Sequence, residues 1–194
     1  MMIQHGEEWL YFQNPEKVLR AERVGEVLPM LREAEASGLF VAGFVSYEAA
    51  PAFDSALKTQ PPDGFPLLCL GLFNAPDVLN EIETGGRDSV RTTHSEHGSD
   101  GASPSNYKIG ELKPSVSKAD FVSAIGEIKE RIAEGATYQV NYTYRLNAGF
   151  SGDAWAFFYE LVKGQKTDYA AFVDTGDFAI CSASPELFFS LKEG

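Results

Sequence analysis

The chain has 194 residues, of which 44% are hydrophobic and 12% aromatic. This composition excludes a wholly disordered protein and predicts one large domain or two small ones. Sixteen basic residues against 28 acidic residues give a net charge of -12, which argues against nucleic acid or an acidic membrane surface as a partner.

The first half of the chain predicts three strands and one helix. Aromatic and branched residues predict a strand over residues 7–12, and apolar residues at helical spacing predict a helix over 25–37 that Gly38 caps. The run 39–47 is almost wholly apolar, which predicts a strand covered on both faces. A further apolar strand is expected over 67–73.

The middle of the chain predicts a solvated segment. Residues 83–117 are rich in Gly, Ser, Asp and Glu, and within 94–106 Ala102 is the sole hydrophobic residue. We therefore expect a flexible loop at 83–117.

A helix with clear boundaries follows this loop. Ser117 is an expected N-cap, Phe121, Ile125, Ile128 and Ile132 repeat at helical spacing, and Gly135 is an expected end. Polar and apolar residues then alternate from Tyr138 to Leu146, which predicts a strand.

The C-terminal part predicts a helix and a hairpin. Asp153 can cap a helix that carries Phe157, Phe158, Leu161 and Val162, and a hairpin is expected around residues 174–177. A last strand is expected over Leu187 to Leu191. Because helices fall between hairpins, the sequence predicts an α+β fold with mainly antiparallel stacked sheets and flanking helices.

Cysteine usage and the absence of a targeting signal favour an intracellular protein. Cys69 and Cys181 each lie in an apolar run, so we expect both to be buried and reduced. No basic N-terminal region and no apolar run long enough to span a bilayer is present, so a cytoplasmic location is expected.

Candidate sites are few. His94 and His97 have the H-x-x-H spacing of a metal site, but a solvated loop is the favoured interpretation, as solvent exposure is for His5. Glu186 could act as an acid or base, or could simply be exposed at a strand start.

Two further sets of polar residues have alternative interpretations. Tyr47 and Glu48 at the end of an apolar strand could be functional or structural. Gln139, Asn141, Thr143 and Arg145 face one way in the expected strand and could bind a carboxylate-bearing small molecule, although a solvent-facing strand surface is the favoured interpretation.

Two motifs together carry a family resemblance. The stretch KADFVSAIGEIKERIAEGATYQVNYTYRL, followed by SASPELFF, resembles the chorismate-utilising enzymes, the group of anthranilate synthase component I and aminodeoxychorismate synthase component I. The segment AGFVSYEAAPAFD, Ala42 to Asp54, looks like the aminodeoxychorismate branch, including its forms fused to a lyase domain.

The resemblance implies a function, a cofactor and a partner. It implies a part of an aminodeoxychorismate synthase that aminates chorismate to 4-amino-4-deoxychorismate for para-aminobenzoate and folate synthesis. Mg²⁺ would bind the substrate carboxylate in the full-length enzyme, and a separate glutaminase subunit would supply ammonia. Anthranilate synthase component I is the alternative, because the motif that separates the two branches lies beyond Gly194.

The family also implies that this chain is incomplete. Its metal-binding glutamates and substrate contacts follow the S-P-E motif, so residues 1–194 are expected to form the N-terminal part of one larger catalytic domain. No catalytic, cofactor-binding or metal-binding residue is assigned, and the chain alone is expected to be inactive. A non-catalytic binding or scaffold module, with self-association through uncovered apolar surface, is the alternative of another class.

Relatives bind tryptophan through an L-L-E-S-like element and an S-P-Y-M element. The residues that match the second element are Thr167, Asp168, Tyr169 and Ala170, and the first element has no match. We therefore do not expect tryptophan binding, and we expect Tyr169 to be a core residue.

Overall fold

The structure is a computed structural model that describes residues 1–82 and 106–191. It divides into two compact units: unit 1 contains the described residues of 1–99 and 154–194, and unit 2 those of 100–153. Each unit contains helices and antiparallel strands, which confirms the predicted α+β class.

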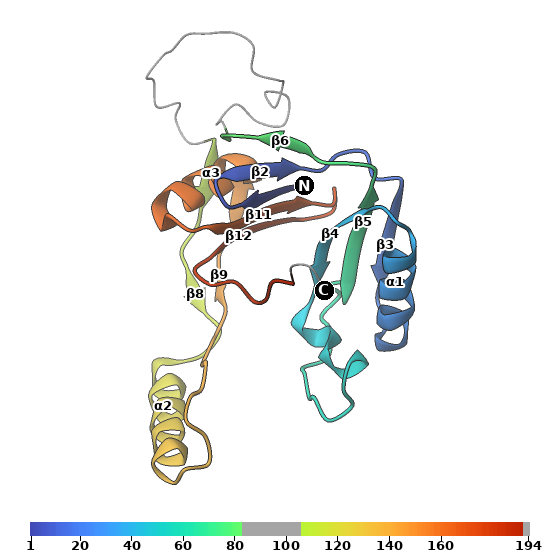
Figure 1. The fold of residues 1–194 in the computed structure, drawn as a ribbon. Coiled ribbons are helices and arrows are strands. Elements are labelled where there is room, and N and C mark those ends of the chain that lie inside the picture. The colour runs from blue at the N-terminus through green and yellow to red at the C-terminus, as the bar shows by residue number, and fades with distance from the viewer. Residues whose placement is uncertain (83–105, 192–194) are drawn as a thin grey trace. The chain divides into compact units, whose positions relative to one another are not determined.

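The first sheet of unit 1 has five antiparallel strands in the spatial order β12, β11, β1, β2, β6 (Figure 1). They are β1 (Met2–His5), β2 (Glu8–Tyr11), β6 (Asp77–Leu79), β11 (Tyr169–Asp174) and β12 (Ala179–Ser184). Helix α3 (Ala154–Gln165) packs against β11 and β12. The predicted strand at 7–12, the C-terminal helix and the hairpin around 174–177 are thereby confirmed.

An aromatic core joins α3 to this sheet. It consists of Met2, Trp9, Trp155, Phe158, Ala170 and Phe172, all buried. The rings of Trp155 and Phe158 each lie within 5.4 Å, centroid to centroid, of the Phe172 ring. Such contacts add directional stabilisation to the burial of apolar surface.

The second sheet of unit 1 has three antiparallel strands in the order β3, β5, β4, with helix α1 against it (Figure 1). The elements are β3 (Lys17–Ala21), α1 (Val24–Ala36), β4 (Phe40–Val45) and β5 (Leu68–Phe73). Every residue of the central strand β5 is buried. The predicted helix at 25–37 and strand at 67–73 are confirmed.

The prediction that the strand at 39–47 is covered on both faces is wrong. Its counterpart β4 is an edge strand, in which Phe40, Val41 and Val45 are 54%, 42% and 42% exposed. A run of apolar residues does not reveal whether a strand is central or at an edge, and here the central position belongs to β5.

Two glycines allow close backbone geometry around these elements. Gly38, with φ +69°, follows α1 in the left-handed conformation expected of a cap. A Cβ on Gly43 of β4 would overlap the carbonyl oxygen of Cys69 on β5, so the two strands can approach this closely only with glycine.

Unit 2 contains one helix and two short antiparallel strand pairs. Its elements are β7 (Tyr107–Ile109) with β10 (Phe150–Gly152), β8 (Lys113–Pro114) with β9 (Leu146–Asn147), and α2 (Lys118–Ala133). The hydroxyl of Ser117 accepts a hydrogen bond from the backbone N–H of Asp120 at 3.1 Å, and Gly135 follows the helix with φ +75°. Both predicted boundaries of this helix are confirmed.

Two other predictions concern segments without regular structure. Of the loop expected at 83–117, residues 83–105 lie outside the described part of the chain, and β7 and β8 occupy 107–109 and 113–114, where the loop prediction is wrong. Leu187 to Leu191 is not a strand, because no described strand pairs with it, and Phe188 and Leu191 are 94% and 81% exposed.

None of the helices in residues 1–82 and 106–191 has both the length and the apolar character that crossing a membrane requires.

Phe158 offers a test of the aromatic core. Its side chain is 0% exposed, and replacing it with alanine would remove ring contacts and leave a cavity. We expect Phe158→Ala to lower the free energy of unfolding, measured by urea denaturation, by about 3–5 kcal/mol. Phe40→Ala, at a side chain that is 54% exposed, is the control and should cost far less. Equal losses in both variants would contradict this core assignment.

Candidate functional site

The predicted row of polar residues, which we call the polar row, consists of Gln139, Asn141, Thr143 and Arg145. It lies in unit 2, but it is not on a strand. Residues 138–145 form no ladder, and β9 begins only at Leu146. The partner strand β8 has two residues, one of them Pro114, which has no backbone N–H to donate. The strand predicted over 138–146 is therefore wrong except for its last residue.

The side chains of the row face solvent. Gln139, Asn141, Thr143 and Arg145 are all exposed. The amide Nε2 of Gln139 donates to Oδ1 of Asn141 at 3.4 Å, and the backbone N–H of Arg145 donates to Oγ of Ser115 at 3.0 Å. Of the two interpretations, the solvent-facing one agrees with this exposure.

The alternation of polar and apolar residues nevertheless has a structural effect. The Phe121 ring of α2 lies 5.6 Å from the Tyr142 ring and 5.8 Å from the Tyr144 ring, centroid to centroid. Tyr142 and Tyr144 thus contact the helix, whereas Tyr138 is 91% exposed, and the polar side chains are left accessible to a ligand or to water.

The S-P-E motif begins where β12 ends. Oγ of Ser184 donates to the carbonyl oxygen of Glu186 at 2.9 Å, and Glu186 itself is exposed. The hydroxyl of Thr167 donates to the carbonyl oxygen of Ser184, which ties the motif to the start of β11. Tyr169 lies opposite Ser184 and is 40% exposed, so its expected core position is wrong. Ala170, the next residue, points into the core instead.

The other candidate residues are not gathered into a cluster. Tyr47 is 80% exposed at the start of the 3-10 helix η1 (Tyr47–Ala52), and Glu48 beside it is half-buried. His5 is exposed, as expected, and His94 and His97 lie outside the described residues. In residues 1–82 and 106–191, no three His, Cys, Asp or Glu side chains lie close enough to hold a metal ion.

A cavity of about 330 Å³ lies in unit 1 between its two sheets. Most of its wall is apolar, and Asp174 and Thr175 add polar groups at one side. The lining residues are Met1, Met2, Tyr11–Pro15, Val18, Cys69, Gly71, Phe73, Trp155 and Phe172–Thr175. They come from distant parts of the chain, so no local sequence signal could have indicated this cavity.

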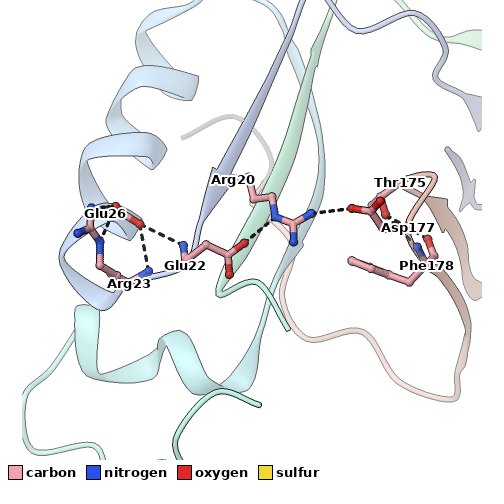
Figure 2. A network of polar contacts seen from close by, with 7 residues as sticks. All are labelled: Arg20, Glu22, Arg23, Glu26, Thr175, Asp177 and Phe178. Carbon is pink, nitrogen blue, oxygen red and sulfur yellow. Dashed lines mark hydrogen bonds and ion pairs between the residues drawn. The ribbon is translucent and has the colours of Figure 1, made fainter. Parts of the chain in front are cut away.

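The turn between β11 and β12 is held against the second sheet by polar and aromatic contacts, which we call the turn clasp. Figure 2 shows its polar contacts. Its residues are Arg20, Phe44, Phe65, Asp177 and Phe178. The Arg20 guanidinium donates to Oε1 of Glu22 at 2.7 Å and to Oδ2 of Asp177 at 3.2 Å. The Phe178 ring lies 4.9 Å from the Phe65 ring and 6.1 Å from the Phe44 ring.

The clasp connects the sheets next to the cavity, because the same turn supplies Asp174 and Thr175 to the cavity wall. Hydrogen bonding to Glu22, and secondarily to Asp177, raises the pKa of Arg20 above its ordinary value. These ion pairs are exposed, so the aromatic contacts contribute most of the attachment. Because β3 also contains Lys17, Arg20 was no distinctive sequence signal for the clasp.

The N-terminus of α1 carries a second polar cluster (Figure 2). The Glu26 carboxylate accepts hydrogen bonds from the backbone N–H groups of Glu22 at 3.1 Å and Arg23 at 3.0 Å, and from the Arg23 side chain. These bonds, with that from the Arg23 side chain first, lower the pKa of Glu26. The cluster fixes the start of α1 immediately after β3.

Both cysteines are free thiols, as predicted. Cys69 is buried beside the cavity, as expected, whereas Cys181 is only partly buried, so its expected full burial is wrong. Burial raises the pKa of both and brings that of Cys181 to about 11, so neither is a thiolate at neutral pH.

Comparison with known proteins identifies relatives of the chain. The profile of the family described as chorismate binding enzyme matches residues 4–194. Aminodeoxychorismate synthase component 1 of Klebsiella aerogenes is 29% identical over 82 residues, which cover 42% of this chain and 18% of that protein. Anthranilate synthase component 1 of Methanothermobacter marburgensis is 26% identical over 164 residues, which cover 79% of this chain and 34% of that protein.

A solved structure shares the fold. It is anthranilate synthase component I from Streptococcus pneumoniae TIGR4, with a TM-score of 0.68 and 19% identity, over 97% of this chain and 52% of that chain. The chain thus spans about half the length of this structure and about a third or less of the two curated relatives.

Glu26 offers a pH-dependent test of the cluster at α1. A carboxylate whose pKa is lowered by folding stabilises the fold above its unfolded pKa, and this contribution is lost as the pH falls through the lowered value. We expect Glu26→Gln, which retains an acceptor for the backbone, to lose less stability on acidification than the unaltered chain. Urea denaturation across the acid range measures this, with Glu35→Gln on the same helix as the control. An unchanged acid dependence in Glu26→Gln would count against the cluster.

Proposed function

The chain belongs to the family of chorismate binding enzymes, and on this premise we propose that it serves the amination of chorismate to 4-amino-4-deoxychorismate, a precursor of para-aminobenzoate and folate. The observation that carries the proposal is the family match from residue 4 to residue 194, which includes both the Y-Q-V-N motif (residues 138–141) and the S-P-E motif (residues 184–186). We also propose that these residues form part of a larger catalytic domain.

The para product is favoured by two observations. The aminodeoxychorismate synthase relative has the higher identity of the two curated relatives, 29% against 26%. In addition, the segment Ala42 to Asp54, which contains the last four residues of β4 and all of η1, resembles that branch of the family.

Anthranilate synthesis is the second candidate. The anthranilate synthase relative matches 79% of this chain, against 42% for the aminodeoxychorismate synthase relative. The two candidates differ in the ring position that is aminated.

Magnesium is proposed for the enzyme but not for the described residues. A divalent ion would neutralise substrate carboxylate charge, which would help a protein of net charge -12 to accept an anion. The residues that the structure describes do not gather a set of ligands that fits the ion.

A glutaminase subunit is the proposed partner. The relatives are named component 1, which implies a second component, and ammonia for amination would come from that subunit. Ammonium salts should then replace the partner in an assay.

The amination itself is testable with the protein expressed from the entire reading frame that contains these 194 codons. With chorismate, Mg²⁺ and ammonium, we expect 4-amino-4-deoxychorismate, detected by chromatography and by conversion to para-aminobenzoate with an added lyase. Anthranilate, detected by its fluorescence, would establish the second candidate instead. The absence of both products would contradict both candidates.

A parallel reaction with residues 1–194 alone is the matched control. We propose that it gives no product, since these residues cover 52% of the solved structural neighbour. Turnover by this chain would show that its own residues build a complete active site.

Self-association through β4 is a further proposal about partners. In the described residues no strand pairs with the outer edge of β4, and this edge carries the exposed Phe40, Val41 and Val45. Two copies of an identical edge can pair antiparallel about a two-fold axis, which would satisfy their backbone groups and cover this apolar surface. The net charge of -12 opposes the contact.

We therefore expect association to strengthen with ionic strength, because salt screens the repulsion. Sedimentation at micromolar concentration measures it, and Val41→Glu should weaken it. Val122→Glu, at a 60% exposed valine of α2, is the matched control. A chain that is strictly monomeric at low and high salt would contradict the proposal.

A further inference from the structure

The chain connections between the two sheets of unit 1 lie next to each other. In the described residues of unit 1, the chain passes from one sheet to the other at residues 12–16, from β2 to β3, and at residues 74–76, from β5 to β6. We call these two connections the hinge. Side-chain hydrogen bonds join them, from the Asn74 amide to Oε1 of Glu16 at 2.5 Å and from the Gln13 amide to Oδ2 of Asp77 at 3.0 Å.

An apolar cluster lies at the hinge. Phe12 of the first connection and Phe73, the last residue of β5, are both buried, and their rings lie 5.1 Å apart, centroid to centroid. Ala42 of β4 belongs to the same cluster. Because the two rings are on or beside the connections themselves, they can stay packed while more distant parts of the sheets separate. The cluster is therefore placed to act as a pivot.

The turn clasp lies away from the hinge on both sheets. In the first sheet the hinge is attached to β2 and β6, whereas the clasp belongs to the turn between β11 and β12, on the other side of β1. In the second sheet the hinge adjoins the pair Lys17 and Leu72. Phe44 of the clasp lies opposite Cys69 instead, and Phe65 comes before β5 begins. The hinge and the clasp are thus two separate attachments between the sheets.

The cavity of about 330 Å³ lies between these two attachments. Its wall includes residues 12–15 of the hinge, Cys69 and Gly71 of β5, and Thr175 of the clasped turn. In a continuous core, side chains interdigitate, and the sheets could not separate without disrupting that packing. Across a cavity there is less packing to disrupt, so separation on the clasp side depends mainly on the clasp contacts.

The clasp contacts are of kinds that break and re-form easily. The side chains of Arg20 and Asp177, which are joined at 3.2 Å (Figure 2), are 38% and 76% exposed, so water can replace their interaction at little cost. The Phe65 side chain is 37% exposed, and Phe178 is half-buried. Regions held by such contacts open locally at a lower free energy than global unfolding requires.

From these features we propose that the turn clasp is a latch, and that the two sheets of unit 1 open about the hinge while both remain folded. When Phe178 leaves Phe65 and Phe44, the turn between β11 and β12 separates from the second sheet, and the cavity wall becomes accessible to solvent. The latch thereby controls entry to the space between the sheets. It does not depend on the proposed amination chemistry, so the two proposals can fail independently.

The two cysteines allow the opening to be measured. Cys69 is 8% exposed and lies in the cavity wall, so opening of the latch uncovers it. Cys181 is the internal reference, because it does not line the cavity and its Sγ donates to the carbonyl oxygen of Ala154 on α3 at 3.5 Å. The chain is treated with N-ethylmaleimide under native conditions, and labelling of each cysteine-containing peptide is followed by mass spectrometry.

Phe178→Ala removes the ring that joins the turn to Phe65 and Phe44. Because two aromatic contacts between the sheets are lost, we expect Cys69 to be labelled about tenfold faster or more. Labelling of Cys181 should stay nearly unchanged, because both sheets remain folded. Phe40→Ala, at a 54% exposed ring of β4 outside the clasp, is the matched control and should change neither rate.

A double variant tests whether the three rings act as one latch. The Phe65 and Phe44 rings lie 5.1 Å apart, and both remain with the second sheet when the turn leaves. Once Phe178→Ala has removed the third ring, adding Phe65→Ala should therefore accelerate Cys69 labelling no further. Effects that multiply in the double variant would contradict a single latch.

The proposal is overturned by any of three further results. These are unchanged Cys69 labelling in a folded Phe178→Ala chain, equal acceleration at both cysteines, which would show general loosening of unit 1, and an equal acceleration of Cys69 in Phe40→Ala. If Phe178→Ala does not fold, Phe65→Ala takes its place, with the same expected and contradicting results at the two cysteines.

Discussion

The pairing of β1 with β11 holds unit 1 together. It places Met2 opposite Phe172 and Ile3 opposite Ala171, so segments from the two ends of the sequence become neighbours in one sheet. Closing so long a loop costs chain entropy, and the burial of the aromatic core under α3 offsets that cost. The positions of the clasp and of the cavity wall depend on this pairing, since it sets where the hairpin of β11 and β12 lies.

The second sheet has a different basis. Its strands and α1 come from one continuous stretch, and its apolar cluster, which includes Leu19, Val27 and Leu70, is formed within that stretch. The two sheets meet through a small cluster of Phe12, Ala42 and Phe73. A limited apolar contact of this kind, supplemented by the turn clasp, leaves room between the sheets for a cavity instead of a continuous core.

Local signals in the sequence predicted the helices and the hairpin well. Ser117 and Gly135 bounded α2 correctly because caps act within a few residues, and the hairpin around 174–177 was found for the same reason. Strands were harder to predict. The sequence analysis missed β1 and β3, and it expected the strand at 39–47 to be buried on both faces, whereas the fully buried strand is β5. These features depend on which strands become neighbours, and a hydropathy pattern carries no such information.

The site was predictable to a smaller extent. The two motifs indicated the family, which the comparisons confirm, but the motif residues Gln139, Asn141 and Glu186 are exposed, and Glu186 belongs to a different unit from the other two. The cavity residues escaped notice because each is an ordinary core or turn residue in its own segment. Tyr11, Cys69 and Asp174 line the same cavity only because the fold brings their segments together.

The position of β11 has a consequence for synthesis on the ribosome. The three strands of the second sheet are complete once Phe73 has been made, whereas the first sheet lacks β11, the neighbour of β1, until residue 174 has been added. The β1 and β2 hairpin must wait through the synthesis of all of unit 2 with its apolar side chains uncovered. A nascent chain stalled before β11 would thus be the species most in need of a chaperone.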